Sequence, residues 1–155
     1  MIKAILAADA EWGIGKNNIL PWSNNSDDLR WFKQITHEQT VVMGRNTWES
    51  LPIKPLPGRY NIVVSSNPVD GPDLVISLQE AKSVLQYTYP GTQKWIIGGA
   101  MLVEALMPII DEIWISRIEG THGCDTFLPS RKIATWYHRQ RIPHNTLDLE
   151  RWVRR

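Results

Sequence analysis

Two adjacent acids open an amphipathic stretch of the chain, the predicted helix from Ser26 to Ile35. Ser26 is a favourable N-cap residue, and acids in the first turn interact well with the helix dipole. Successive residues of a helix are about 100° apart around its axis, which puts Phe32 and Ile35 within about 40° of Asp28. Asp28 therefore lies at the centre of the apolar stripe, and we expect its carboxyl group to point into the core.

A carboxyl group in this position needs a partner, because burying a charge costs several kcal/mol when nothing compensates it. No cationic residue shares the Asp28 face of the helix, whereas Asp27 falls about 115° from the centre of the apolar stripe, on the polar side with Arg30 and Gln34. Two interpretations are open at this point. Either backbone groups or another strand satisfy Asp28, or its partner is a ligand with a pair of hydrogen-bond donors.

Two further stretches share a strand–glycine–helix design. Val41–Met43 leads through Gly44 into a predicted helix, and Trp95–Ile97 leads through Gly98-Gly99 into another. In a parallel sheet both joints lie at the carboxyl edge, where ligands of open α/β sheets bind. Each helix start offers backbone N–H groups to a phosphate, and glycine permits close approach. Together the joints predict a pyrophosphate site, although a single joint of this kind is more often an ordinary turn.

The glycines near the N-terminus do not form the fingerprint of a Rossmann fold. Gly13-Ile14-Gly15 is followed by Lys16-Asn17-Asn18, so the GxGxxG pattern is absent. A dinucleotide would therefore be held by a different scaffold. The stretch Lys16–Asn25 is rich in Asn, and a loop of this length without regular structure is often functional.

Hydrophobic periodicity predicts the elements that must position these residues. Apolar, β-rich runs predict strands at Ile2–Ala8, Thr40–Met43, Tyr60–Val64, Lys94–Ile97, Glu112–Ser116, Trp136–Ile142 and Leu147–Val153. Helical periodicity predicts helices at Ser26–Ile35, Arg45–Leu51, Leu78–Tyr87 and Ala100–Met107. The alternation indicates an α/β domain with a largely parallel sheet, and a hairpin connected by Pro143-His144-Asn145 would add antiparallel strands.

Composition narrows the class of protein. The 155 residues suit one domain over 1–155, and 17 basic against 16 acidic side chains give no global charge for nucleic acid or a membrane. The single cysteine, Cys124, fits a reducing compartment, and no stretch has the layout of a signal peptide or the length of a membrane helix. We expect a cytoplasmic monomer without a metal. We interpret the seven basic residues of 131–155 as a solvated surface rather than a nucleic-acid site.

Several sequence blocks follow one another at a characteristic spacing. They are Ile14-Gly15, Leu20-Pro21-Trp22, Asp28-Leu29, Trp31-Phe32, Met43-Gly44-Arg45, Thr47-Trp48-Glu49-Ser50, Leu56-Pro57-Gly58-Arg59, Ile97-Gly98-Gly99 and Asp125-Thr126-Phe127. Together they resemble dihydrofolate reductase from Ile5 to about Phe127, with a weaker match to the end. The resemblance implies a central, eight-stranded, mostly parallel sheet with a C-terminal antiparallel hairpin and about four flanking helices. It also implies a cis peptide bond between Gly98 and Gly99.

The activity implied by the resemblance is hydride transfer from NADPH to dihydrofolate, with the proton for pterin N5 coming from solvent. Asp28 would pair with the 2-amino group and N3 of the pterin ring. Arg59 would pair with the α-carboxylate of the substrate's glutamate, a task suited to a planar guanidinium. The implied catalytic residues are Asp28, Leu20, Trp22 and Ser116. The substrate would also contact Ile5, Ala7, Phe32, Leu51, Leu56, Arg59 and Ile97.

The resemblance also implies a set of cofactor contacts. Arg45 and Ser66 would hold the 2′-phosphate, which favours NADPH over NADH, and the loop Gly15–Trp22 would close over the nicotinamide. The full set is Ala7, Ile14, Gly15, Leu20, Gly44, Arg45, Asn46, Thr47, Ser65, Ser66, Ile97, Gly98, Gly99, Ala100, Met101, Leu102, Val103 and Thr126.

Three positions depart from the family pattern. Val103 stands where an aromatic residue, often Tyr, borders the nicotinamide, and Met101 stands where some members have Arg near the pyrophosphate. Ser116 replaces the usual Thr beside the acid, but its hydroxyl can still bridge Asp28 and a pterin donor. The difference at Val103 bears on the turnover rate more than on the activity itself.

Two other functions are weighed against this one. A reductase of the same fold acts on an aminopyrimidine nucleotide in flavin biosynthesis, and its substrate lacks the pterin–glutamate arrangement that Asp28 and Arg59 together suit. The alternative from another class is a folate- or nucleotide-binding protein without turnover. This alternative stays open because Val103 stands where the family usually has an aromatic residue beside the nicotinamide.

Overall fold

The computed structural model describes residues 1–16, 26–87, 93–144 and 147–155. Its strands are β1 (Ile2–Ala8), β2 (Gly13–Gly15), β3 (Thr40–Gly44), β4 (Tyr60–Val64), β5 (Leu74–Ile76), β6 (Lys94–Gly98), β7 (Glu112–Ile118), β8 (Thr126–Phe127), β9 (Tyr137–His144) and β10 (Leu147–Val153). The helices are α1 (Ser26–Thr36), α2 (Arg45–Ser50), α3 (Leu78–Tyr87), α4 (Ala100–Leu106) and α5 (Ser130–Ile133), with a 3-10 turn η1 at Met107–Ile109.

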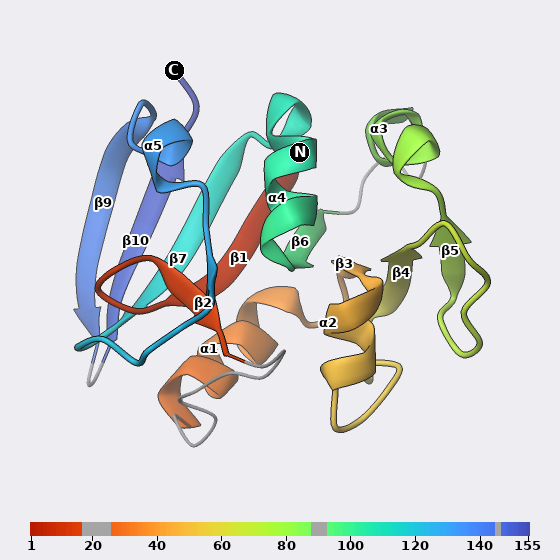
Figure 1. Ribbon diagram of the computed structural model, residues 1–155, viewed down its shortest axis with the longest axis horizontal. Coiled ribbons are helices and arrows are strands. Elements are labelled where there is room, and N and C mark those ends of the chain that lie inside the picture. Colours follow the sequence, from red (N-terminus) through yellow and green to blue (C-terminus); the bar gives the residue numbers. More distant parts are fainter. Residues whose placement is uncertain (17–25, 88–92, 145–146) are drawn as a thin grey trace.

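Eight strands form the central sheet in the order β5-β4-β3-β6-β1-β7-β10-β9 (Figure 1). The neighbours from β5 to β7 are parallel, and β10 pairs antiparallel with both β7 and β9. A mostly parallel sheet that ends in an antiparallel hairpin confirms the expected fold class. A separate pair of short strands, β2 and β8, lies beyond the carboxyl end of β1.

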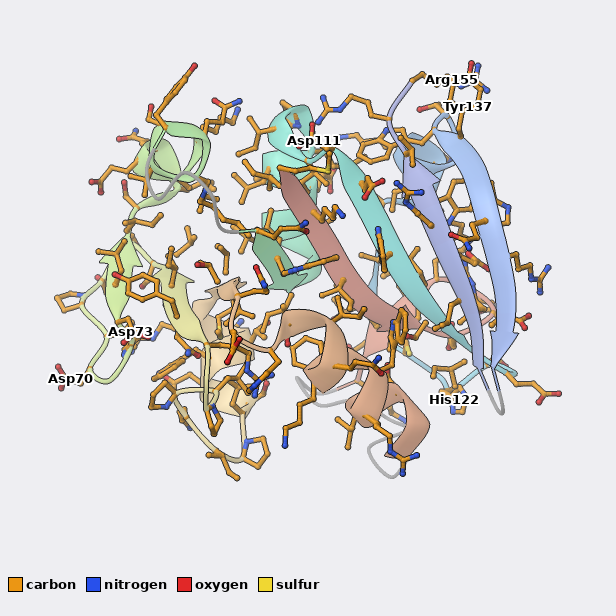
Figure 2. The ribbon with its side chains drawn as sticks, turned by 180° about the vertical axis from the view of Figure 1, so that it is seen from behind. Asp70, Asp73, Asp111, His122, Tyr137 and Arg155 are labelled. Atoms are coloured by element: carbon orange, nitrogen blue, oxygen red, sulfur yellow. The ribbon has the colours of Figure 1, made fainter. Side chains whose placement is uncertain are left out.

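The helices divide between the two faces of the sheet. The larger core lies on the face covered by α3, α4 and α5, which all contribute buried aliphatic side chains to it. On the other face, Trp48 of α2 packs against the strand residues Val41, Met43 and Val63. Figure 2 shows α1 on this second face, in front of β1 and β7. None of the described helices is long and apolar enough to cross a membrane.

Alternation along β1 decides which side chains lie on the α1 face. The even-numbered residues of β1 join the larger core. The odd-numbered residues Lys3, Ile5 and Ala7 therefore lie on the α1 face. Because Ala7 pairs with Ser116 of β7 in the parallel register, Ser116 lies on the same face.

The short elements differ from the sequence prediction. The strands β2, β5 and β8 have two or three residues each, too few for a two-residue period to emerge. The four-residue helix α5 brings the described helices to five instead of about four. Residues Pro143 and His144 were expected in the hairpin connection but belong to β9. β9 is the edge strand of the sheet, where a proline without an N–H group is tolerated.

Arg155 lies beside Tyr137 at the same end of the sheet as Asp111 (Figure 2), and the backbone N–H of Arg154 donates to the Asp111 carbonyl oxygen at 3.2 Å. The Arg154 guanidinium donates hydrogen bonds to the carbonyl oxygens of Met107 (2.6 Å), Pro108 (2.8 Å) and Ile110 (3.0 Å). These carbonyls follow the end of α4, where a helix leaves backbone acceptors unpaired. Arg154 thus connects the end of the chain to the end of α4.

We expect Arg154→Ala to lower the free energy of unfolding by about 1–2 kcal/mol, because partly buried carbonyl groups lose a charged donor. Urea denaturation measures the change. Arg155→Ala is the matched control, since Arg155 stacks on the exposed Tyr137 ring at 4.8 Å and should change stability by at most about 0.5 kcal/mol. Equal effects of the two substitutions would contradict the role given to Arg154.

Candidate active site

Asp28 lies on the face of α1 that packs against the sheet, as the helical phase predicted. The residue is 8% exposed, and its carboxyl group is hydrogen-bonded to the Ser116 side chain of β7, which is 2% exposed. Burial raises the pKa of Asp28 to about 6, and the hydrogen bond from Ser116 lowers it by a smaller amount. Near neutral pH this carboxyl group can therefore exist in both charge states.

The two interpretations of Asp28 are partly resolved by this contact. A neighbouring strand does supply a partner, the Ser116 hydroxyl. The pKa remains raised because burial outweighs that hydrogen bond. A carboxyl group held in this way is suited to donors from a ligand, because a carboxylate has several lone pairs to offer.

Apolar side chains near α1 have surface available to a ligand. Leu51, Leu56 and Ile97 pack together against the small core of the α1 face, and all three are partly exposed. Phe32 of α1 is also partly exposed, whereas Ile5 is 3% exposed. The structure thus brings Leu51, Leu56 and Ile97 into one cluster.

Arg59 lies beside the C-terminal end of α1. Its Nη1 donates to Thr36 Oγ1 at 3.1 Å and its Nε donates to the Pro57 carbonyl oxygen at 3.0 Å. The guanidinium carbon lies 5.8 Å from the centre of the Phe32 ring. These contacts fix the orientation of the guanidinium, whose remaining N–H groups find no acceptor among the described residues. It is therefore oriented to bind a carboxylate.

The two strand–glycine–helix joints meet at the carboxyl edge of the sheet. A Cβ atom built on Gly44 would lie 3.8 Å from the Gly99 nitrogen, so the two backbones are neighbours. Gly98 has a φ of 132°, which side chains disfavour, and a Cβ there would lie 3.4 Å from Thr47 Oγ1. The Gly98–Gly99 peptide bond is cis, which confirms that prediction.

The helices that start at these glycines have no side-chain cap. Gly44 and Gly99 are the N-cap residues of α2 and α4, and no described side chain hydrogen-bonds to the first turn of either helix. The free N–H groups and the space left by missing Cβ atoms fit the phosphates of a dinucleotide.

The two predicted contacts of the 2′-phosphate, Arg45 and Ser66, lie at one corner of this edge together with the predicted cofactor residue Ser65. Arg45 follows β3 directly, and Ser65 and Ser66 follow β4, whose last residue pairs with Gly44. Arg45 Nε lies 3.4 Å from Glu49 Oε1, and the Arg45 side chain is 46% exposed. Ser65 Oγ accepts a hydrogen bond from the Asn67 backbone N–H at 3.1 Å.

Asn46 and Ala100 lie in the first turns of α2 and α4, and other predicted cofactor residues are placed as follows. Ile14, Gly15 and Thr126 come together because β2 pairs with β8, with Gly15 opposite Thr126. The side chains of α4 divide: Met101 is 87% exposed, whereas Leu102 is 8% exposed and Val103 is fully buried in the larger core. Contact between Val103 and a cofactor stays a prediction. Leu20 and Trp22 lie outside the described residues.

Asp9 was not singled out from the sequence, yet it holds the turn that leads into β2. Its carboxylate, 1% exposed, accepts hydrogen bonds at 2.9 Å from the backbone N–H groups of Glu11, Gly13 and His122 (His122 is labelled in Figure 2). Burial alone would raise the pKa of Asp9, but these hydrogen bonds outweigh it and leave the pKa below its usual value. The contacts with Glu11 and Gly13 are local and form a turn of the kind that an aspartate favours. The contact with His122 joins segments far apart in the chain, and no sequence pattern reports it.

Leu29 is a second residue that sequence reasoning did not assign to the site. It follows Asp28 on α1 and is 52% exposed. The helical wheel could have found it, since it is an apolar residue about 100° from Asp28. An exposed leucine next to the buried acid adds apolar surface for a ligand.

Comparisons with known proteins agree with this geometry. A model of the dihydrofolate reductase family matches residues 1–151. The chain is 39% identical over 139 residues to a dihydrofolate reductase of Bacillus subtilis, covering 88% of this chain and 80% of that protein. It is 36% identical over 152 residues to a type 3 dihydrofolate reductase of Salmonella typhimurium, covering 96% and 91%.

A solved structure is similar over nearly the whole chain. It is a dihydrofolate reductase from Enterococcus faecalis complexed with NADP(H) and RAB-propyl, with a TM-score of 0.87 and 31% sequence identity. The match covers 99% of this chain and 96% of that one. With its buried acid on α1 and its paired glycine joints, this chain belongs to the dihydrofolate reductase family.

Proposed function

We propose that the chain catalyses the NADPH-dependent reduction of 7,8-dihydrofolate to tetrahydrofolate. The observation that carries this proposal is the Asp28 carboxyl group, which is buried against Ser116 of β7 on the α1 face of the sheet. A carboxyl group with a raised pKa, set with a few polar groups among apolar side chains, is typical of an enzyme's substrate site.

Asp28 acts on the pterin ring as acceptor and as proton reservoir. As a carboxylate it accepts hydrogen bonds from the 2-amino group and N3. As an acid, with a pKa of about 6, it keeps one more proton in the site without contacting N5. Ser116 orients the carboxyl group through its hydroxyl.

The rest of the substrate fits the same face of the sheet. Leu51, Leu56, Phe32 and Ile97 offer apolar surface to the aminobenzoyl ring, with Ile5 and Ala7 beneath. Arg59, oriented by Thr36 Oγ1 and the Pro57 carbonyl, binds the α-carboxylate of the glutamate.

The residues present fit NADPH, because Gly44, Gly98 and Gly99 leave space beside uncapped helix starts. Thr47 and Thr126 would lie along the cofactor, and Arg45 with Ser65 and Ser66 would hold the 2′-phosphate. When bound, NADPH supplies the hydride. The chain's own part is to orient the two rings and exclude water from between them.

The assay that tests the proposal follows the NADPH absorbance with and without dihydrofolate. We expect oxidation of NADPH that depends on dihydrofolate and not on an aminopyrimidine nucleotide. Oxidation with the nucleotide alone would favour the flavin-pathway reductase. Binding of NADPH without oxidation would favour a binding protein without turnover.

Arg45→Ala should raise the Kd of NADPH about tenfold, equivalent to about 1.4 kcal/mol, and change the Kd of NADH by less than about twofold. The reason is that the guanidinium meets the 2′-phosphate, which NADH lacks. Glu49→Gln is the matched control, because it removes the ion-pair partner of Arg45 and keeps the guanidinium. It should not weaken NADPH binding. Equal losses for the two cofactors in Arg45→Ala would show that Arg45 does not bind the phosphate.

We also propose that the enzyme works as a monomer in the cytoplasm. The near balance of 17 basic and 16 acidic side chains and the single cysteine support this assignment. Light scattering of the purified protein tests the oligomeric state, and a dimer mass would contradict it.

A further inference from the structure

The strand β7 meets α1 through two of its side chains, Ser116 and Trp114. They are two residues apart, so both point to the α1 face of the sheet. Ser116 is hydrogen-bonded to Asp28. The Trp114 ring stacks on Trp31 of α1, with ring centres 6.2 Å apart and an angle of 19° between the planes. Asp28 and Trp31 are three residues apart and therefore on neighbouring parts of one helix face.

Trp114 is itself fixed by the residues around it. Its indole Nε1 donates to Glu112 Oε2 at 3.2 Å, and the Trp95 ring meets it edge-on with centres 5.4 Å apart. The Lys3 ammonium lies 5.1 Å from the Trp114 ring centre and 3.1 Å from Glu112 Oε2. Glu112, 3% exposed, also pairs with Arg151. A ring held by an aromatic neighbour, a cation and a hydrogen bond makes a rigid support.

We propose that Trp114 is a positioning residue for the reaction: by stacking on Trp31 it holds α1 at the depth that buries Asp28 against Ser116. This inference rests on the proposed function, in which Asp28 acts on the pterin ring. Trp114 contributes through α1 and does not itself contact the reacting atoms.

Two opposing effects set the pKa of Asp28. Burial is the larger cause, and the Ser116 hydrogen bond has a smaller effect of opposite sign. If α1 loosens, water reaches the carboxyl group and both effects weaken, so the net change is a fall of the pKa toward its usual value. Beside Trp114, Lys3 and Arg151 both form ion pairs with Glu112. On α1 itself, Arg30 and Lys33 are exposed.

Trp114→Leu tests the stack, Trp114→Phe keeps an aromatic ring, and Trp136→Leu is the matched control. Trp136 is a buried tryptophan of the larger core, under Arg154, so its loss destabilises the protein without touching α1. The pKa of Asp28 is read in the ligand-free protein from the carboxyl carbon by NMR, assigned with Asp28→Asn. The kcat/KM for dihydrofolate is measured beside it.

We expect Trp114→Leu to lower the pKa of Asp28 by at least about one unit and kcat/KM at neutral pH at least about tenfold. Trp114→Phe should restore kcat/KM to within about threefold, and Trp136→Leu should leave the Asp28 pKa within about 0.2 of the parent. If Trp114→Leu does not fold, Trp31→Leu removes the same stack from the partly exposed side and should lower the pKa likewise.

An unchanged Asp28 pKa in Trp114→Leu, or an equal fall in Trp136→Leu, would overturn the proposal. A lowered pKa with unchanged kcat/KM would overturn it too, because the depth of Asp28 would not matter to the reaction. If the parent protein shows no dihydrofolate-dependent oxidation of NADPH, the proposed function fails. The NMR titration then still decides whether Trp114 sets the depth of Asp28.

Discussion

Asp28→Asn is expected to lower kcat/KM for dihydrofolate at neutral pH by at least about 10²-fold, equivalent to about 2.7 kcal/mol of transition-state stabilisation. The amide keeps the shape of the side chain and its reach to Ser116. One of its two terminal atoms is an NH2 donor, so it cannot accept N–H donors on both atoms as a carboxylate does, and it does not ionise. The measurement is steady-state NADPH oxidation over a range of dihydrofolate concentrations.

The neighbouring acid provides the control for this substitution. On the helical wheel Asp27 falls about 115° from the apolar stripe, where its role is a dipole contribution of about 0.3–1 kcal/mol. Asp27→Asn should therefore leave kcat/KM within a few-fold of the parent. A damaging Asp27→Asn and a mild Asp28→Asn would mean that the two acids have been assigned the wrong roles. Two mild substitutions would make the buried carboxyl group a structural feature.

Asp28→Asn should also stabilise the ligand-free protein in a pH-dependent way. The folded-state pKa of Asp28, about 6, lies above the usual 3.8, so between these values the folded state binds more protons than the unfolded state. Stability contributed by Asp28 is therefore fully present below pH 3.8 and is lost as the pH rises through about 6. Above that window the cost of the buried carboxylate is about 3 kcal/mol.

Asparagine carries no such cost, because it does not ionise. The free energy of unfolding of Asp28→Asn should exceed that of the parent by at most about 3 kcal/mol at pH 7 to 8, and the difference should vanish near pH 4. Urea denaturation of both proteins across this range gives the difference. Glu49→Gln, at an acid whose side chain is 56% exposed, is the control and should show no such trend. A difference that is flat with pH, or that grows toward acid, would contradict a raised pKa.

Much of this site could be predicted from local sequence. The phase of α1 identified the buried acid, because a 3.6-residue period and a single polar residue within an apolar stripe are enough to place Asp28. Glycines after buried strands identified the joints at Gly44 and Gly98-Gly99, because parallel strands end at one edge. The cis bond and the roles of Arg45 and Arg59 came from the resemblance and not from periodicity.

Other features depend on contacts that no local pattern records. The stack of Trp31 on Trp114 and the hydrogen bond between Ser116 and Asp28 depend on how α1 lies on β7. The burial of Val103 depends on which side of α4 meets the sheet, and the seven residues of that helix include several apolar ones that could have faced it. The strands β2, β5 and β8 form because longer elements bring their backbones together.

The central claim is that the ionisation of Asp28 governs the reaction, and kcat/KM for dihydrofolate against pH tests it most directly. Reduction adds a hydride and a proton to the pterin, so the site is reactive in the state that holds one more proton. The pH dependence of kcat/KM reports the pKa of the essential group in the free enzyme. We predict that kcat/KM of the parent falls as the pH rises above about 6, the pKa of Asp28, and that this inflection is absent in Asp28→Asn. A parent profile without an inflection near pH 6, or the same inflection in Asp28→Asn, would contradict the account.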